Sequence, residues 1–237
     1  MRTFPFVLIL ALIVGCAISG WAEKATDGDI LFQYSTFSAL QAGVFDGDMS
    51  VGELKKHGDF GIGTFNGLDG EMVILDGTIY QVGTDGKPRP AGTDMKVPFA
   101  VATFFQSDRT VMIENGLDMA QLRDFMDKLL PSKNVFYAIK IIGEFPYLKL
   151  RSLSKQTHPY RKLAEVYKDQ VIFDGNNVKG ALVGFWIPTY ATGINAMSYH
   201  FHFLSDDLSL GGHVLDCRVR GATAIIDEIP VFHLVLP

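Results

Sequence analysis

Cysteine is nearly absent from the sequence, which has 2 cysteines among its 237 residues. Cys16 lies in an apolar N-terminal segment that we expect to be a targeting signal, so only Cys217 remains as a thiol in the body of the protein. A single thiol cannot form an intramolecular disulfide. The sequence therefore excludes a small disulfide-rich domain, and an exported chain of this kind must rely on its core and on any metal it binds.

An excess of positive charge is also lacking, because 21 Lys and Arg residues stand against 26 Asp and Glu residues, for a net charge of −5. Without a basic face, the chain is not expected to bind nucleic acid. Long hydrophobic runs are missing as well, except for Phe4 to Ile18, which is too short and too early for a stable membrane span. With 48% hydrophobic residues, the chain has the composition of an ordinary globular protein with a large core.

The first 22 residues have the pattern of a secretory signal peptide. Arg2 precedes the apolar run Phe4 to Ile18, as in the charged and hydrophobic regions of such signals. Two processing routes are open. Ile13-Val14-Gly15-Cys16 resembles a bacterial lipobox, which would leave Cys16 as a lipid-anchored N-terminus, whereas Gly20-Trp21-Ala22 offers small residues for ordinary cleavage. Both routes predict an exported protein, periplasmic or extracellular, in which residues 23–237 form one domain.

Glycine and phenylalanine are abundant, with 24 and 18 residues, which favours strands and turns over a helical bundle. The sharpest local signal is Asp76-Gly77 between two apolar runs, which predicts a hairpin with a type I′ turn. Ser50 with Glu53 has the spacing of a capping box, and Asp118 with Gln121 predicts the start of an amphipathic helix that stops before Pro131.

These patterns predict an α+β fold that is predominantly β, with two mixed or antiparallel sheets forming two closely packed subdomains and a few short helices. We expect helices within 30–57, 118–130 and 159–168, and a loop over 83–92. The expected strands are 60–82 with its hairpin, 97–105, 110–113, 135–142, 171–173, 181–187, 196–204, 213–219 and 222–229. A soft internal boundary is expected near 144–170, between a mixed first part and an all-β second part.

Three of the six histidines fall close together, as His200, His202 and His213. His200 and His202 belong to an alternating, aromatic-rich run that reads as a strand, so both imidazoles project from one face. Gly211-Gly212 places His213 at the start of the returning strand. A single buried histidine is more often a hydrogen-bonded core residue, but three imidazoles with an open fourth position suit a catalytic Zn²⁺ or a similar divalent ion.

Three other polar residues stand in apolar or glycine-rich surroundings. Glu71 opens the apolar hairpin, where a carboxylate is costly to bury without a partner, although a solvated strand end is an equal alternative. The guanidinium of Arg151 suits a carboxylate ligand, while a surface ion pair is its commoner role. Thr64 could donate a hydrogen bond, and it would draw no attention alone.

Taken together, these segments resemble the acetolactate decarboxylase family. The resemblance rests on Gly61-Ile62-Gly63-Thr64-Phe65, Leu68-Asp69-Gly70-Glu71-Met72, Arg151-Ser152 with Pro159-Tyr160, and His200-Phe201-His202 with His213. It spans roughly residues 28–236, with the motifs in the family's order and at similar spacing. Leu31 to Thr36 and Gly43 to Gly47 fit the same pattern.

The resemblance implies a specific chemistry. Members of this family bind zinc through three histidines, which match His200, His202 and His213, and their active-site glutamate, arginine and threonine match Glu71, Arg151 and Thr64. Their reaction converts (S)-2-acetolactate, a 2-hydroxy-3-keto acid, into (R)-acetoin and CO₂, with zinc as a Lewis acid that stabilises an enediolate. The family resemblance also favours a homodimer.

One feature departs from the family pattern, in which a glutamate close to the C-terminus reaches the metal. The last acidic residues here are Asp227 and Glu228, so that role is missing, is filled by another group, or lies beyond this sequence. Two other readings of the histidines stay open. A cupin-like dioxygenase or isomerase also uses a strand-borne H-x-H with a later histidine, and an exported metal- or solute-binding module would use the histidines for affinity alone.

Overall fold

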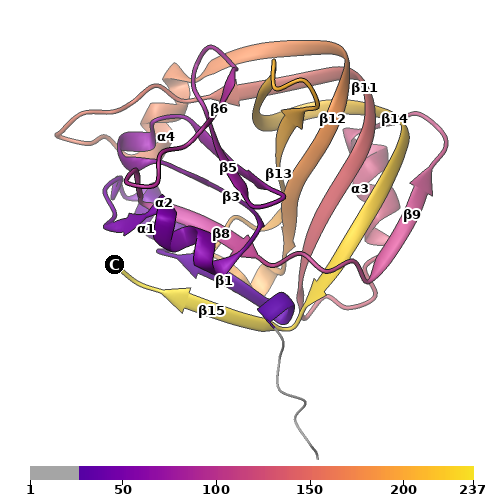
Figure 1. The fold of residues 1–237 in the computed structure, drawn as a ribbon, viewed down its shortest axis with the longest axis horizontal. Helices are drawn as coiled ribbons and strands as arrows, with labels where there is room; N and C mark the ends of the chain where they lie inside the picture. Colours follow the sequence, from indigo (N-terminus) through magenta and orange to yellow (C-terminus); the bar gives the residue numbers. More distant parts are fainter. Residues whose placement is uncertain (1–26) are drawn as a thin grey trace, which may run out of the picture.

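The computed structural model describes residues 27–237, so the predicted signal peptide and Cys16 lie outside the described residues. The first of its two large sheets has seven strands (Figure 1). Their order is β15 (Val231–Val235), β1 (Ile30–Tyr34), β8 (Phe99–Thr103), β3 (Phe60–Thr64), β4 (Glu71–Leu75), β5 (Thr78–Val82) and β6 (Pro88–Pro90). β1 and β15 run parallel and the other neighbours are antiparallel, so this sheet is mixed.

The second sheet is antiparallel, and three of its strands, β11 (Phe136–Ser152), β12 (Val171–Ile187) and β14 (Gly211–Ile229), are very long. Its order is β10 (Leu117–Asp118), β14, β11, β12 and β13 (Ser198–Ser205), with β9 (Arg109–Ile113) also paired to β14. β13 pairs with the beginning of β14 as well as with β12. Because β11 joins β12 to β14, this additional pairing closes part of the sheet upon itself. Two short strands, β2 (Met49–Ser50) and β7 (Lys96–Val97), form a third, small sheet.

Short helices connect and cover the strands. The α-helices are α1 (Phe37–Gln41), α2 (Val51–Leu54), α3 (Met119–Asp127) and α4 (Leu163–Val166), and the 3₁₀ turns are η1 (Asp27–Asp29), η2 (Lys55–His57), η3 (Asn66–Leu68), η4 (Tyr167–Asp169) and η5 (Thr189–Ala191). Both predicted capping boxes are present, at Ser50 with Glu53 and at Asp118 with Gln121. Each satisfies backbone N–H groups that the first helical turn cannot pair internally.

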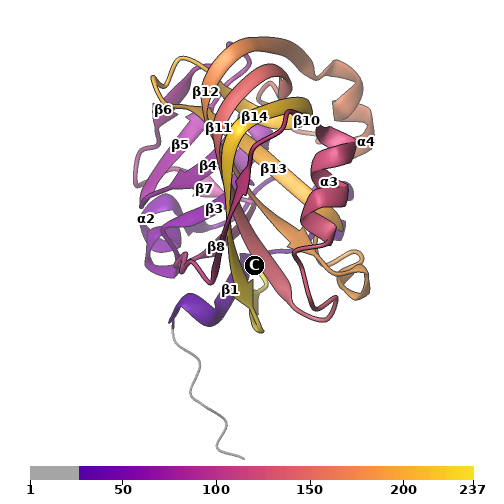
Figure 2. The ribbon, with the colours of Figure 1, turned by 90° about the vertical axis from the view of Figure 1, so that its right-hand side faces the viewer.

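The two sheets pack face to face with α2 and α3 on their outer sides, whereas α1 and α4 contribute side chains to the core between the sheets. Side chains of both sheets, among them Ile62, Val73, Val183 and Phe185, share the core between them. The other face of the second sheet packs on α3, whereas the other face of the first sheet packs on α2. Figure 2 shows α2 and α3 on opposite sides of the molecule. Alternate residues of each strand therefore enter different cores, as the period of a strand requires.

The predicted α+β, mainly β fold with two packed sheets is confirmed, and so is its hairpin. The turn residues Asp76 and Gly77 have φ of 48° and 76°, as a type I′ turn needs. Among the described residues no helix is long and apolar enough to cross a membrane. Cys217 is a free, buried thiol.

Three local predictions were wrong. Residues 30–34 form β1 rather than part of a helix, since β15 and β8 flank this strand and its apolar side chains enter two cores. Pro88–Pro90 is a strand at the sheet edge, where the missing N–H of proline costs no ladder bond. The helix expected from residue 159 begins at Leu163, because Tyr160 packs against Phe45 and bonds to Asp46 outside any helix.

The chain passes between the two large sheets over residues 104–108 and again at Pro230. The boundary expected near 144–170 does not coincide with either passage. Much of that range belongs to β11, which continues without a break to Ser152 inside the second sheet.

Candidate metal centre and its cavity

The three predicted histidines meet at the junction of β13 and β14. His200 and His202 lie on β13, where both face the core between the sheets while Phe201 and Phe203 face α3. β14 returns beside β13, and His202 is directly opposite His213 in the ladder. The predicted return of the chain at Gly211 and Gly212 is thus confirmed.

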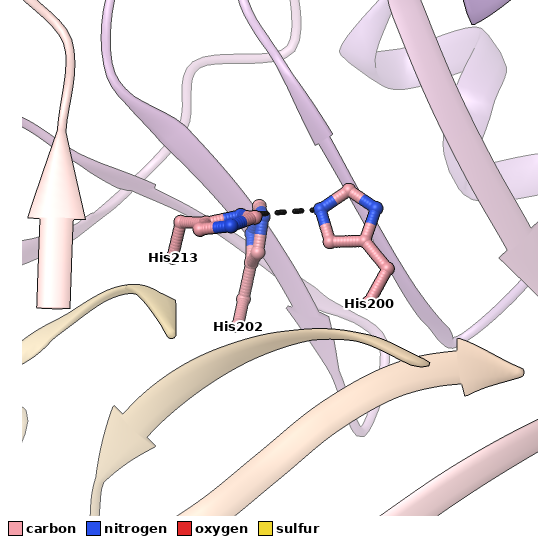
Figure 3. A group of neighbouring side chains, drawn as sticks. All are labelled: His200, His202 and His213. Carbon is pink, nitrogen blue, oxygen red and sulfur yellow. Dashed lines mark hydrogen bonds between the residues drawn. The ribbon is translucent and has the colours of Figure 1, made fainter. Parts of the chain in front are cut away.

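The imidazoles are close enough to share one ion (Figure 3). One nitrogen from each of His200, His202 and His213 lies within 4.8 Å of the other two. Nε2 of His200 and Nδ1 of His213 are 3.2 Å apart. Two nitrogens bound tetrahedrally to one zinc ion would be separated by about 3.3 Å, from Zn–N bonds of about 2.0–2.1 Å. The spacing of this pair therefore matches a metal site.

A hydrogen bond fixes the orientation of the third imidazole. Nδ1–H of His202 donates to the carbonyl oxygen of Met72, at 2.7 Å. Because a carbonyl only accepts hydrogen bonds, this contact sets the tautomer and leaves Nε2 of His202 with a free lone pair. Metal-binding histidines usually have such a support on their second nitrogen. Met72 belongs to β4, so the bond also ties the second sheet to the first.

Burial keeps the three histidines neutral. It lowers the pKa of His200 to about 3 and the pKa values of His202 and His213 well below their usual range. The nearby Arg151 guanidinium acts in the same direction on all three. Because a histidine binds a metal only through an unprotonated nitrogen, these imidazoles are ready ligands at neutral pH.

The first sheet contributes a carboxyl group to the same place. Glu71 opens β4, and its Oε2 lies 3.5 Å from Nε2 of His202. Its Oε1 lies 3.9 Å from Nη1 of Arg151, which is beyond hydrogen-bonding distance. The exposed fractions of the Glu71 and Arg151 side chains are only 7% and 8%. Burial raises the pKa of Glu71, against the opposing effect of Arg151.

Arg151 reaches the site from β11. In the ladder it is opposite His213 of β14, so Arg151, His213 and His202 occupy three adjacent strands. The atoms Glu71 Oε1 and Arg151 Nη1 are buried and have no hydrogen-bond partner. Native proteins rarely leave such groups unpaired, and a bound ligand is one of the usual reasons.

Thr64 lines the site beside Glu71, its partner in the β3–β4 ladder. Its hydroxyl donates to the carbonyl oxygen of Gly70, at 2.7 Å. The oxygen keeps lone pairs that can accept a hydrogen bond from a ligand. In this structure Thr64 therefore fixes the turn that leads into β4 and presents an acceptor to the cavity.

All six predicted residues surround one small cavity of about 40 Å³. Its remaining walls are mostly apolar, from Phe37, Leu40, Gly63, Leu68, Phe99, Leu153, Leu163 and Tyr167. A wider hollow of about 390 Å³ adjoins it and shares Phe37, Arg151, Tyr167, His200 and His213 with it. The hollow gives a small solute a route from the surface to the histidines.

The donor set fits a zinc ion with an open position. Three neutral imidazoles with an open fourth position are typical of catalytic rather than structural zinc sites, and Glu71 Oε2, 3.5 Å from Nε2 of His202, could be an additional ligand. A guanidinium with an unpaired N–H stands beside them, so a ligand with adjacent oxygen atoms and a carboxylate would satisfy both groups. The arrangement can therefore hold a small, negatively charged oxygen ligand in a largely apolar chamber.

Comparison with known proteins identifies the family. The model of one protein family, alpha-acetolactate decarboxylase, matches residues 31–237. The chain belongs to the alpha-acetolactate decarboxylase family. A curated alpha-acetolactate decarboxylase from Methanosarcina mazei is 46% identical over 88% of this chain and 73% of its own length. The corresponding protein from Methylococcus capsulatus is 45% identical over 87% of this chain and 80% of its own.

Solved structures of alpha-acetolactate decarboxylases share the fold. The crystal structure of the Bacillus subtilis strain 168 protein has a TM-score of 0.86 and 40% identity, covering 88% of this chain and 89% of that one. A Staphylococcus aureus protein of unknown function, described as similar to the family, has a TM-score of 0.85 and 32% identity, covering 88% of this chain and 89% of that one.

The carboxylates of Asp227 and Glu228 lie outside the cavity that the three histidines line. Asp227 accepts a hydrogen bond from the backbone N–H of Gln106, and neither Asp227 nor Glu228 lines the chamber. Sequence patterns missed other wall residues, above all Tyr167, whose ring lies under the Arg151 guanidinium. Nothing local to Tyr167 signals this contact, because it arises when η4 folds against β11.

Proposed function

We propose that the protein is a zinc-dependent carboxy-lyase that converts (S)-2-acetolactate into (R)-acetoin and CO₂. One observation carries the proposal: a single buried chamber joins three neutral imidazoles to a glutamate and an arginine, each of which has one buried atom without a hydrogen-bond partner. His200, His202 and His213 would hold the ion. Curated relatives that are 46% and 45% identical bear the name alpha-acetolactate decarboxylase, which supports the choice of substrate.

A bound zinc ion would supply a Lewis acid for the negative charge that develops on the ketone oxygen. Arg151 binds the substrate carboxylate through its unpaired Nη1 and an adjacent N–H. This contact orients the bond between the carboxyl carbon and C2. When that bond breaks, CO₂ leaves and its electron pair delocalises into the neighbouring ketone as an enediolate.

Glu71 is our candidate for the proton transfer. A proton must be added to C2 of the enediolate on one face, which fixes the handedness of acetoin. Burial raises the pKa of Glu71, against the opposing effect of Arg151, and so favours the protonated form that a proton donor needs. Its unpaired Oε1 lies on the Arg151 side of the chamber, within reach of the place where the carboxylate departs.

The apolar walls protect the reaction. Phe37, Leu40 and Phe99 surround the chamber, and its small volume leaves little space for water beside a substrate. Low local polarity strengthens every charge interaction within it and favours conversion of a carboxylate into uncharged CO₂. Thr64 adds a hydrogen-bond acceptor for a substrate hydroxyl.

The decisive experiment incubates the zinc-loaded protein with racemic acetolactate and measures acetoin, with and without a chelator. We expect one acetoin and one CO₂ per (S)-acetolactate consumed, and loss of turnover on metal removal. Turnover that needs O₂ would favour a cupin-like dioxygenase instead. Zinc binding without any acetoin would favour an exported metal-binding module.

The proposal includes export and a homodimer. Residues 1–22 have the signal pattern described above, and the family resemblance favours two copies. Expression of the full chain in a bacterial host, followed by mass spectrometry of the mature N-terminus, separates cleavage after Ala22 from lipid attachment at Cys16. A cytoplasmic, uncleaved product would contradict export. Light scattering of the purified protein gives its oligomeric state.

A further inference from the structure

The Arg151 guanidinium rests on an aromatic ring. Its central carbon lies 4.3 Å from the ring centroid of Tyr167, which belongs to η4. The same ring lines both the inner cavity and the outer hollow. Tyr167 thus stands where the two spaces join, with Arg151 between its ring and Glu71.

The stack is the directional contact that orients the guanidinium. Nη1 of Arg151 has no hydrogen-bond partner among the described residues, and the nearest Glu71 oxygen, at 3.9 Å, is too distant for one. An arginine side chain has several rotatable bonds, so an unrestrained head group would sample many orientations. The face of an aromatic ring against the guanidinium restricts that freedom and leaves Nη1 available to a ligand.

Tyr167 is itself held in place. Leu163 and Val166, in the preceding α4, are 2% and 1% exposed in the core between the sheets. Two residues after Tyr167, Asp169 pairs with Arg161 at 2.7 Å. The ring therefore belongs to a fixed segment and can serve as a rigid platform.

We propose that Tyr167 is the positioning residue of the carboxylate clamp, holding the Arg151 guanidinium in the plane that meets the substrate carboxylate. The ligand assignment rests on the proposed function, but the positioning role does not depend on turnover. The ring acts through Arg151, so its contribution is to carboxylate binding and orientation. The hydroxyl also lies near Arg151, but the positioning is assigned to the ring.

The test compares Tyr167→Phe, which keeps the ring, with Tyr167→Leu, which removes it. Binding of 2,3-dihydroxy-2-methylbutanoate, a substrate analogue whose ketone is reduced, is measured by calorimetry on the zinc-loaded proteins. We expect Tyr167→Leu to weaken binding roughly tenfold and Tyr167→Phe to change it less than about threefold, as a desolvated cation–π contact implies. The matched control is Tyr147→Leu, in the hollow lined by Asp118 and Asp216 rather than in the chamber.

A double-mutant cycle with Arg151→Gln tests whether the ring acts through the arginine. In that background Tyr167→Leu should cost much less than in the wild type. Equal costs in both backgrounds, or equal losses for Tyr167→Phe and Tyr167→Leu, would overturn the proposal. Zinc content and melting temperature identify a variant that has simply misfolded, and Tyr167→Phe then still decides whether the hydroxyl matters.

Kinetics separate this inference from the proposed function. If acetolactate is turned over, Tyr167→Leu should raise KM and lower kcat/KM, with Tyr167→Phe restoring both. If the wild type binds the analogue but releases no acetoin, the proposed function fails while the calorimetric comparison still confirms or overturns the role of Tyr167.

Discussion

At the scale of single residues, the burial of Glu71 and Arg151 lowers the stability of the folded protein. Both side chains are more than nine-tenths buried, and each has an atom without a hydrogen-bond partner. An unpaired buried polar group costs about 1–3 kcal/mol, and more when it is charged. A fully hydrogen-bonded ion pair would avoid this cost, so the wide spacing of 3.9 Å favours an inserted ligand over a structural salt bridge.

The first prediction concerns the planar guanidinium of Arg151. Arg151→Lys should keep the fold but lower kcat/KM for acetolactate by roughly 10- to 100-fold, because an ammonium cannot form paired hydrogen bonds with a carboxylate. Steady-state kinetics and a thermal melt measure the two effects. Arg220→Lys, on an exposed arginine paired with Glu144, is the matched control and should stay at wild-type rate. Unchanged kinetics for Arg151→Lys would exclude a bidentate carboxylate clamp.

The second prediction concerns the histidines. His202→Ala removes the proposed zinc ligand whose second nitrogen is fixed by Met72, so bound zinc and acetoin formation should disappear together. Metal analysis of the purified protein and the acetoin assay follow both. His158→Ala, at a side chain that is 71% exposed, should retain both. A His202→Ala protein that lost its metal and kept its full rate would refute metal-dependent catalysis.

At the scale of elements, the site depends on how β14 begins. Gly212 has φ of +144°, a conformation that side chains rarely adopt, and a Cβ there would lie 2.9 Å from the carbonyl oxygen of Arg151. This glycine lets β14 pair with β13 and β11 at once. His213, the next residue, is positioned by the same backbone.

The third prediction follows from that backbone. Gly212→Ala should destabilise the fold by about 1–3 kcal/mol, which lowers the melting temperature of a chain of this size by roughly 2–12 °C. Zinc affinity should fall with it, since His213 shifts. Calorimetric melts of the metal-free and zinc-loaded proteins give both quantities. Gly83→Ala is the control, because its Cβ would meet only Asp85 at 3.6 Å. Equal melting temperatures for the two variants would contradict the argument.

Local patterns predicted the strand-borne histidines and the Asp76-Gly77 turn, since both depend on neighbours in sequence. The extents of the long strands were not predicted. β11 was expected to end at 142, yet it passes a register shift near Gly143 and skips Pro146 in its ladders. β14 continues through Gly221, where φ is +55°. Tertiary pairing with two neighbours carries these strands through residues that break isolated ones.

Local sequence patterns also could not show that the cavity residues come together. The sequence resemblance named Thr64, Glu71, Arg151 and the histidines, and the structure brings all of them to one chamber. Their roles in catalysis stay predictions. Periodicity alone could not place Glu71 beside His202, because the two strands belong to different sheets and meet only when those sheets pack.

At the scale of the whole molecule, a buried acid on β14 lies beside the passage between the sheets over residues 104–108. Asp227 is 2% exposed and accepts a hydrogen bond from the backbone of Gln106. Burial, together with the negative charges of Asp108, Asp29 and Asp59, raises the pKa of Asp227 to about 7. The folded protein therefore binds this proton more tightly than the unfolded chain does.

The fourth prediction is the resulting pH dependence of stability. The contribution of protonated Asp227 is fully present below its ordinary pKa of 3.8 and is lost as pH rises through about 7. Asp227→Asn, which keeps an acceptor for Gln106, should lessen the decline in melting temperature between about pH 5 and pH 8. Differential scanning calorimetry across that range measures it. Asp76→Asn, at a side chain that is 79% exposed, is the control. A variant as pH-sensitive as the wild type would disprove the assignment.

The parallel pairing of β1 with β15 constrains how the protein is made. β1 is among the first strands to leave the ribosome, and β15 follows all the others. One edge of β1 therefore stays unpaired until the ribosome has synthesised all the strands of the second sheet. Such distant pairings form slowly, and an open strand edge is prone to aggregation. A nascent chain of this protein is therefore expected to depend on a chaperone until β15 has been synthesised.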